Sequence, residues 1–175
     1  MRPLFFYATA ALIVVCDQVS KWAVTERLFP NRSVPAIGNF LKLSYTENTG
    51  GAFSLLQANN RIFVIIAIVA IAALAYAYQR SSKSELMVNA ALALALGGAL
   101  GNLIDRIRLH HVVDFFDLQY NGRNIWPIFN VADSAITVGI VLLAWHFVFK
   151  RDPAPAVKPL ADEMAPASTA EQISP

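Results

Sequence analysis

Four long apolar segments dominate this sequence and place the chain in a membrane class. They cover residues 4–24, 62–78, 86–104 and about 132–149. A helix needs roughly 20 mainly apolar residues to cross a bilayer, and each segment is close to that length. With 56% hydrophobic and 15% charged residues, the composition also differs from that of soluble domains. We therefore predict an all-α membrane protein with four transmembrane helices.

The first and third segments raise separate questions. Met1-Arg2 before the first apolar run is also typical of a secretory signal peptide, but signal cleavage needs small residues before the cut and Val15 precedes Cys16. We expect this segment to stay attached, with Cys16 as a small core residue. Gly97 and Gly101 have the four-residue spacing that lets membrane helices approach closely.

The connections between the segments carry two different patterns. Residues 41–46 alternate apolar and polar side chains, which indicates a strand, and residues 48–51 form a turn signal. Residues 52–54 are expected to return as a second strand, which gives a small periplasmic hairpin or sheet beside the membrane. Residues 105–131 are rich in aromatic rings, which are typical of the headgroup region. We predict an interfacial loop there.

The terminal segments lie on one side of the membrane because the number of spans is even. After Arg151 the sequence turns to Pro, Ala, Ser and acidic residues, so we predict a four-span domain over 1–151 and a disordered tail over 152–175. Six lysines and arginines lie on the terminal side and eight on the opposite side. This near tie gives no orientation by the positive-inside rule.

Most of the unusual polar residues fall at the side opposite the termini. Antiparallel spans bring the end of each odd-numbered span beside the start of each even-numbered span there. Ionisable groups at membrane depth are costly and usually face a bundle interior, so the group is a candidate site. Its members are Asp17, Lys21, Asn48, Arg61, Asn102, Asp105, Arg106, Asp114, Asn130 and Asp133.

Each member also has a purely structural interpretation. Asp17 and Lys21 are four residues apart and can form an ion pair on one helix face. Asp133 precedes Ser134 and can cap the last span. Asp105-Arg106 is compatible with an ordinary charged helix end, and Asp114 with a solvated loop carboxylate.

Two of the carboxylates acquire a chemical meaning as a pair. One carboxylate can take a proton from water while a second, protonated carboxyl donates to an amide carbonyl oxygen. Asp114 and Asp133 lie on either side of the aromatic loop, so the returning chain can bring them together. Spacing alone makes this a weak hypothesis.

Metal and nucleic-acid functions receive no support. The chain has one cysteine and three scattered histidines, and no His/Cys/Asp/Glu set has metal-ligand spacing. A net charge of +2 is too balanced for binding a phosphate backbone. We expect no metal, no cofactor and no nucleic-acid partner.

Five short motifs stand in order at the span ends and in the neighbouring loops. They are Asp17–Lys21, Asn48–Ser54, Gly101–Arg106, Val112–Phe115 and Phe129–Ser134. Together with the four spans they cover residues 4–150, and this chain resembles the lipoprotein signal peptidases, also called signal peptidase II. Five ordered motifs are far more specific than one. Gly51 departs from the family pattern, which more often has Ala, and implies only a more flexible turn.

The resemblance implies an aspartic endopeptidase of the bacterial inner membrane. It would remove signal peptides from diacylglyceryl-modified prolipoproteins just before the lipidated cysteine, and globomycin-type peptides would inhibit it. Both termini would be cytoplasmic and the site periplasmic, with the 105–131 loop as a flap over the substrate. The implied residues are Asp114 and Asp133 for catalysis, Asn48, Asn102, Arg106 and Asn130 for substrate binding, and Asp17, Lys21, Gly101 and Asp105 for structural support.

Two other classes of protein remain as alternatives. A small proton-coupled transporter also uses intramembrane carboxylates, but its key acid should lie near the bilayer midplane. Here the acids gather at one side, and the second and fourth spans carry none in their interiors. A structural assembly subunit gives no reason for two separate aspartates.

Overall fold

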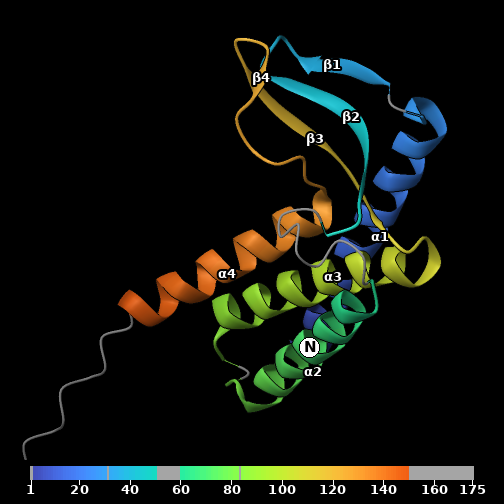
Figure 1. The fold of residues 1–175 in the computed structure, drawn as a ribbon. Helices are drawn as coiled ribbons and strands as arrows, with labels where there is room; N and C mark the ends of the chain where they lie inside the picture. The colour runs from blue at the N-terminus through green and yellow to red at the C-terminus, as the bar shows by residue number, and fades with distance from the viewer. Residues whose placement is uncertain (1, 31, 51–59, 83, 150–175) are drawn as a thin grey trace, which may run out of the picture.

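The computed structural model describes residues 2–30, 32–50, 60–82 and 84–149, which form a helical bundle with a small sheet at one end (Figure 1). All four helices are long and apolar enough to cross a membrane. The predicted four-span architecture is therefore confirmed. The helices are α1 (Arg2–Leu28), α2 (Asn60–Arg80), α3 (Leu86–Arg108) and α4 (Val131–Phe149).

Helix α3 is the centre of the bundle and contacts each of the other three helices. Its middle is built from alternating Ala and Leu followed by glycines, and most of these residues are buried. In contrast, α2 has no buried residue. Lipid is as apolar as leucine, so membrane helices associate through close packing of small residues rather than through hydrophobic burial. The small residues of α3 explain its central position.

Three glycines let the neighbouring helices touch α3. A Cβ atom on Gly97 would lie 2.7 Å from the carbonyl oxygen of Ala10 in α1, and one on Gly98 would collide with the carbonyl oxygen of Ala132 in α4. A Cβ on Gly101 would lie 2.6 Å from the Asp17 carboxylate. The close approach predicted from Gly97 and Gly101 is confirmed, and Gly98 extends it to α4.

The sheet is antiparallel with the strand order β1-β2-β3-β4. The central pair brings distant parts of the sequence together, with Lys42 opposite Asp117 and Thr46 opposite Asp114. The strand predicted from residues 41–46 is confirmed, whereas the return strand at 52–54 lies outside the described residues. The strands are β1 (Ser33–Ile37), β2 (Leu41–Asn48), β3 (Val112–Tyr120) and β4 (Arg123–Asn124).

The prediction that residues 105–131 form a single loop is wrong for the first part of this segment, whereas its position at the membrane interface stays a prediction. Its first residues continue α3 as far as Arg108, and residues 112–120 form β3 in the middle of the sheet. The aromatic rings of Phe115 and Phe116 are compatible with membrane-interface anchors. Consecutive β-branched and aromatic residues also favour a strand. In this chain the segment pairs with β2 and is therefore a strand.

The sheet rests on the end of α1. Val24 and Leu28 of α1 are buried against Tyr45, Val113 and Phe115 of the sheet. These contacts fix β3, and with it residue 114, relative to the bundle.

Cys16 is exposed, contrary to the expectation of a core position. An apolar side chain in a membrane span loses nothing by facing lipid, so its hydrophobicity does not predict burial within the protein.

The contact at Gly98 generates a prediction. Gly98→Ala puts a methyl group against the α4 backbone, and we expect a loss of about 1–3 kcal/mol or more of stability from overpacking. The measurement is the thermal unfolding midpoint in detergent. The matched control is Ala70→Val on the exposed face of α2, which should melt as the parent chain does. Equal midpoints for the Gly98 variant and the parent would contradict the packing described here.

Candidate functional site

A buried ammonium group joins α1 to α3. Lys21 Nζ lies 2.8 Å from Asp17 Oδ2, 2.8 Å from Asp105 Oδ2 and 3.0 Å from Asn102 Oδ1. The three acceptors match the three protons of a lysine ammonium group. The ion pair predicted between Asp17 and Lys21 exists, and Asp105 completes it as a second carboxylate.

The two carboxylates of this cluster also hold the segments that follow. Asp17 Oδ1 accepts a hydrogen bond from the backbone N–H of Ala132 at 3.0 Å, which fixes the start of α4. Asp105 Oδ2 accepts one from the N–H of Val113 at 3.2 Å, which fixes the start of β3. Gln18 Nε2 donates to Asp105 Oδ1 at 2.9 Å. Sequence reasoning did not select Gln18, although it lies inside the first motif.

The first turn of α4 is closed by a capping box. Asn130 Oδ1 accepts the N–H of Asp133 at 2.9 Å, and Asp133 Oδ2 accepts the N–H of Asn130 at 3.3 Å. Asn130 is therefore the capping residue, and Asp133 supplies the reciprocal bond from the first turn. The interpretation of Asp133 as the capping residue is therefore wrong, because Asn130 is the cap. The reciprocal bond fixes the position of one Asp133 oxygen.

Side-chain amides connect Asp133 with Asp114. Asn102 Nδ2 donates to Asp133 Oδ1 at 2.8 Å. Asn130 Nδ2 donates to Asp114 Oδ1 at 2.6 Å and also approaches Asn102 Oδ1 at 3.1 Å. The two aspartates thus belong to one continuous hydrogen-bond network that reaches back to Lys21.

Asp114 receives a second donor from the sheet. It lies on β3, only 1% exposed, and its Oδ2 accepts a hydrogen bond from Asn48 Nδ2 at 2.8 Å. The amide of Asn48 is itself oriented by a turn, because its Oδ1 accepts the N–H of Gly50 at 2.8 Å. Gly50 has a φ of 101°, which favours glycine at this position.

The environment of Asp114 stabilises its protonated form. Burial raises the pKa of the Asp114 carboxyl to about 7, and the negative charge of Asp133 acts in the same direction. The amide donors Asn48 and Asn130 oppose this rise without cancelling it. Near neutral pH, Asp114 can therefore hold or release a proton, which is the property required of a general acid or base.

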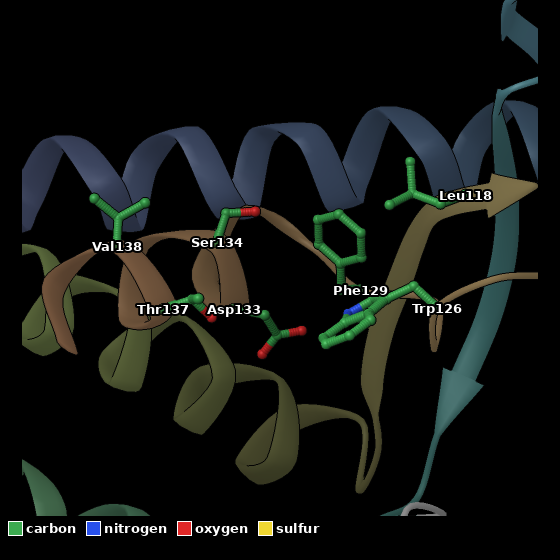
Figure 2. A pocket seen from close by; sticks show the side chains of 7 residues that line it. All are labelled: Leu118, Trp126, Phe129, Asp133, Ser134, Thr137 and Val138. Carbon is green, nitrogen blue, oxygen red and sulfur yellow. The ribbon is translucent and has the colours of Figure 1, made fainter. Parts of the chain in front are cut away.

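An apolar cavity of about 310 Å³ opens beside Asp133. Figure 2 shows the Asp133 carboxyl group between α4 and the ring of Trp126, with Phe129 and Leu118 farther along the wall. Ser134, Thr137 and Val138 complete the lining from α4. A cavity with mostly apolar walls and a single carboxyl group suits an apolar ligand whose reacting bond lies at its edge.

The structure brings nearly all of the predicted site residues together. Asn48, Asn102 and Asn130 direct amide groups at the two aspartates, and Gly101 provides the space that Asp17 occupies. The Arg106 guanidinium lies 5.5 Å from the Phe63 ring centre and forms no ion pair within 4.0 Å in the described segments, but it interacts electrostatically with Asp133 and Asp114. No group of three or more potential metal ligands occurs among those residues.

Comparison with known proteins gives one consistent result. Residues 9–149 match the model of the family described as signal peptidase (SPase) II. A lipoprotein signal peptidase of Moorella thermoacetica is 41% identical over 143 residues, covering 82% of this chain and 92% of that protein. One of Caldanaerobacter subterraneus is 42% identical over 140 residues, covering 80% and 93%.

Solved structures agree with the sequence comparisons. Two structures of a bacterial membrane enzyme superpose with TM-scores of 0.75 and 0.77, each at 33% sequence identity. They cover 85% and 84% of this chain, and 93% and 94% of their own chains.

The buried ammonium group generates a prediction about stability. Lys21→Met leaves Asp17 and Asp105 buried without their cation, and we expect a loss of about 3–5 kcal/mol. Unfolding in detergent measures this, with Lys42→Met in β2 as the control that should change little. Adding Asp17→Asn and Asp105→Asn to Lys21→Met should restore part of the loss. A Lys21→Met variant as stable as the control would show that the cluster does not hold the bundle together.

Proposed function

Because the chain belongs to the signal peptidase II family, we propose that it is an intramembrane aspartic endopeptidase acting on prolipoproteins. It removes the signal peptide from the diacylglyceryl-modified precursor and cuts just before the lipidated cysteine. The observation that carries the proposal is the pair Asp114 and Asp133, tied into one amide network beside an apolar cavity. Neither a transporter nor an assembly subunit requires this paired geometry.

The two carboxyls have different roles in the proposed reaction. Asp114 carries the proton, in keeping with its raised pKa of about 7, which results from burial and from the charge of Asp133. We assign Asp133 as the ionised base because it lies at the N-terminal turn of a helix, where negative charge is favoured.

The chemical step then needs only water and these two groups. Asp133 takes a proton from the water while the water oxygen attacks the carbonyl carbon of the scissile peptide bond. Asp114 donates its proton to the carbonyl oxygen, which gives a neutral tetrahedral diol. Asp133 then gives its proton to the peptide nitrogen while Asp114 takes a proton from a hydroxyl of the diol. The carbon–nitrogen bond breaks, the signal peptide is released with a carboxyl end, and the pair returns to its starting protonation. Two neighbouring carboxyl groups do not both ionise readily, because their negative charges repel each other. The resting state of the pair therefore holds one proton.

The surroundings of the pair suit a lipid-linked substrate. The cavity beside Asp133 takes apolar groups of the substrate, while Arg106 and the amides of Asn48, Asn102 and Asn130 contact its peptide backbone. Both aspartates lie at the side of the bundle where α3 ends and where α2 and α4 begin, and all three helices are long enough to span a membrane. The scissile bond must therefore be presented at the membrane surface. Globomycin-type peptides would block the reaction by occupying the same place.

We also propose an orientation for the protein. It is a multi-pass protein of the bacterial inner membrane, with the sheet and the aspartates at the periplasmic face and both termini in the cytoplasm. The peptidase domain covers residues 1–151, and the segment 152–175 is a cytoplasmic tail that takes no part in the chemistry.

The catalytic assignment predicts the effect of two conservative changes. Asp114→Asn and Asp133→Asn should each lower cleavage of lipidated precursor at least about 100-fold, since each removes proton exchange while nearly keeping size. The matched control is Asp117→Asn, which alters a buried carboxyl three residues farther along the same strand. The assay is turnover in detergent with protein of verified melting temperature. Normal turnover in either catalytic variant removes that aspartate from the mechanism.

The substrate assignment predicts a strong dependence on the lipid. The diacylglyceryl chains stay in the hydrocarbon region, each buried CH₂ contributing about 0.8 kcal/mol, and so hold the adjacent peptide bond at a fixed depth. A precursor whose modifiable cysteine is replaced by serine should be cleaved at least about tenfold more slowly than the lipidated form. Rates are compared at matched concentrations in one membrane mimic. Equal rates would show that the enzyme recognises the peptide alone.

A further inference from the structure

A further cavity lies at the end of the bundle that is far from the sheet and from the two aspartates (Figure 1). It measures about 360 Å³ and is formed where α2 ends, α3 begins and α4 ends. It shares no lining residue with the cavity beside Asp133. The part of α3 between Val88 at this cavity and Asn102 at the aspartates is roughly 21 Å long. The cavity is therefore separate from the proposed active site.

Polar contacts between the helices hold the walls of this cavity in place. Asn89, only 5% exposed, accepts a hydrogen bond from Ser81 Oγ at 2.7 Å and donates one to the carbonyl oxygen of Ser82 at 3.1 Å. These bonds fix the end of α2 against the start of α3. On the opposite wall, His146 Nε2 of α4 lies 3.9 Å from Glu85 Oε1 at the start of α3. Three helices thus build this cavity together.

The charged residues that line the cavity lie at helix ends and carry both signs. Arg80 is the last residue of α2, and Glu85 comes directly before the first residue of α3. Arg80 Nε donates to the hydroxyl of Tyr76 at 3.1 Å, but the guanidinium forms no ion pair within 4.0 Å in the described segments. A positive and a negative group at one cavity favour a ligand that carries both an anion and a cation.

The apolar residues of the cavity lie deeper in the bundle than the charged ones. Val88 and Leu92 are about one and two turns inside α3, and Leu143 is about one turn before His146 in α4. Both helices are long enough to span a membrane, so the charged end of the cavity lies toward the membrane surface and the apolar end toward the hydrocarbon. A phospholipid has the same arrangement, with a charged headgroup above its acyl chains.

We propose that this cavity binds a phospholipid with a primary-amine headgroup, such as phosphatidylethanolamine. The Arg80 guanidinium holds the phosphate through charge-assisted hydrogen bonds, and Glu85 accepts an N–H of the ammonium group beside His146. A choline headgroup has no N–H to donate. A glycerol headgroup brings a negative phosphate near Glu85 without a compensating cation. This lipid lies at the side of the membrane opposite the aspartates, so it is distinct from the substrate's diacylglyceryl group.

Native mass spectrometry of the purified full chain in detergent tests the proposal. The probes are phosphatidylethanolamine, phosphatidylcholine and phosphatidylglycerol with the same acyl chains. Each is titrated without substrate, so the result does not depend on the proposed peptidase activity. One molecule of phosphatidylethanolamine should bind at least about tenfold more tightly than either other lipid. Equal affinities for the three lipids would show unselective contact, and tighter phosphatidylglycerol would show an acidic-lipid site. Either result would overturn the proposal.

Four variants locate the site. Glu85→Gln should lower the affinity for phosphatidylethanolamine to that for phosphatidylcholine, whereas Arg80→Gln should weaken both about tenfold, because the phosphate loses a charge-assisted hydrogen bond. The matched controls are Glu26→Gln and Arg27→Gln, two exposed residues near the end of α1 on the side of the aspartates, which should leave all affinities unchanged. Melting temperatures verify the fold of each variant. A retained preference in Glu85→Gln, or equal losses in the control variants, would overturn the assignment.

Discussion

The ammonium group of Lys21 is the interaction on which the rest of the site depends. A buried charge is tolerated only when it is paired and fully hydrogen-bonded, and here two carboxylates and an amide oxygen surround it. Each carboxylate uses further lone pairs to hold the backbone at the start of α4 and of β3. One buried cation thereby fixes four elements relative to one another, and the two aspartates are carried on two of them.

The two aspartates differ because the secondary structures that carry them differ. Asp133 starts a helix, where backbone N–H groups and the helix dipole favour a carboxylate. Asp114 is the third residue of the strand β3, outside any helix, and its burial removes the carboxyl group from solvent. Asn130 serves both aspartates, because it caps the helix that carries Asp133 and donates a hydrogen bond to Asp114 on the strand.

Hydropathy alone was sufficient to predict the four spans, since a bilayer imposes both the length and the composition of a helix that crosses it. Gly97 and Gly101 correctly predicted close helix contact. The predicted third span ends at residue 104, four residues before the end of α3, because Asp105 and Arg106 resemble a charged flank although Asp105 is buried in an ion cluster. Local sequence does not show that a distant lysine neutralises it.

For a similar reason, neither β3 nor the amide network could be predicted from the local sequence. The aromatic residues at 115 and 116 are compatible with an interface or a strand, and only the presence of β2 as a partner distinguishes them. Asn102 and Asn130 were selected as substrate contacts through a family resemblance. Their role in orienting the two carboxylates depends on contacts between residues that are 16 and 31 positions apart in the chain.

The position of Asp133 at the very start of the last helix has a consequence for biosynthesis. Spans enter the membrane in order as the chain leaves the ribosome, so Asp114 is made and its strand can pair before its partner exists. The carboxyl pair is complete only when the fourth span has been inserted with its first turn capped and its backbone tied to Asp17. A chain that lacks its fourth span therefore holds only one of the two carboxyls to which we assign the chemistry.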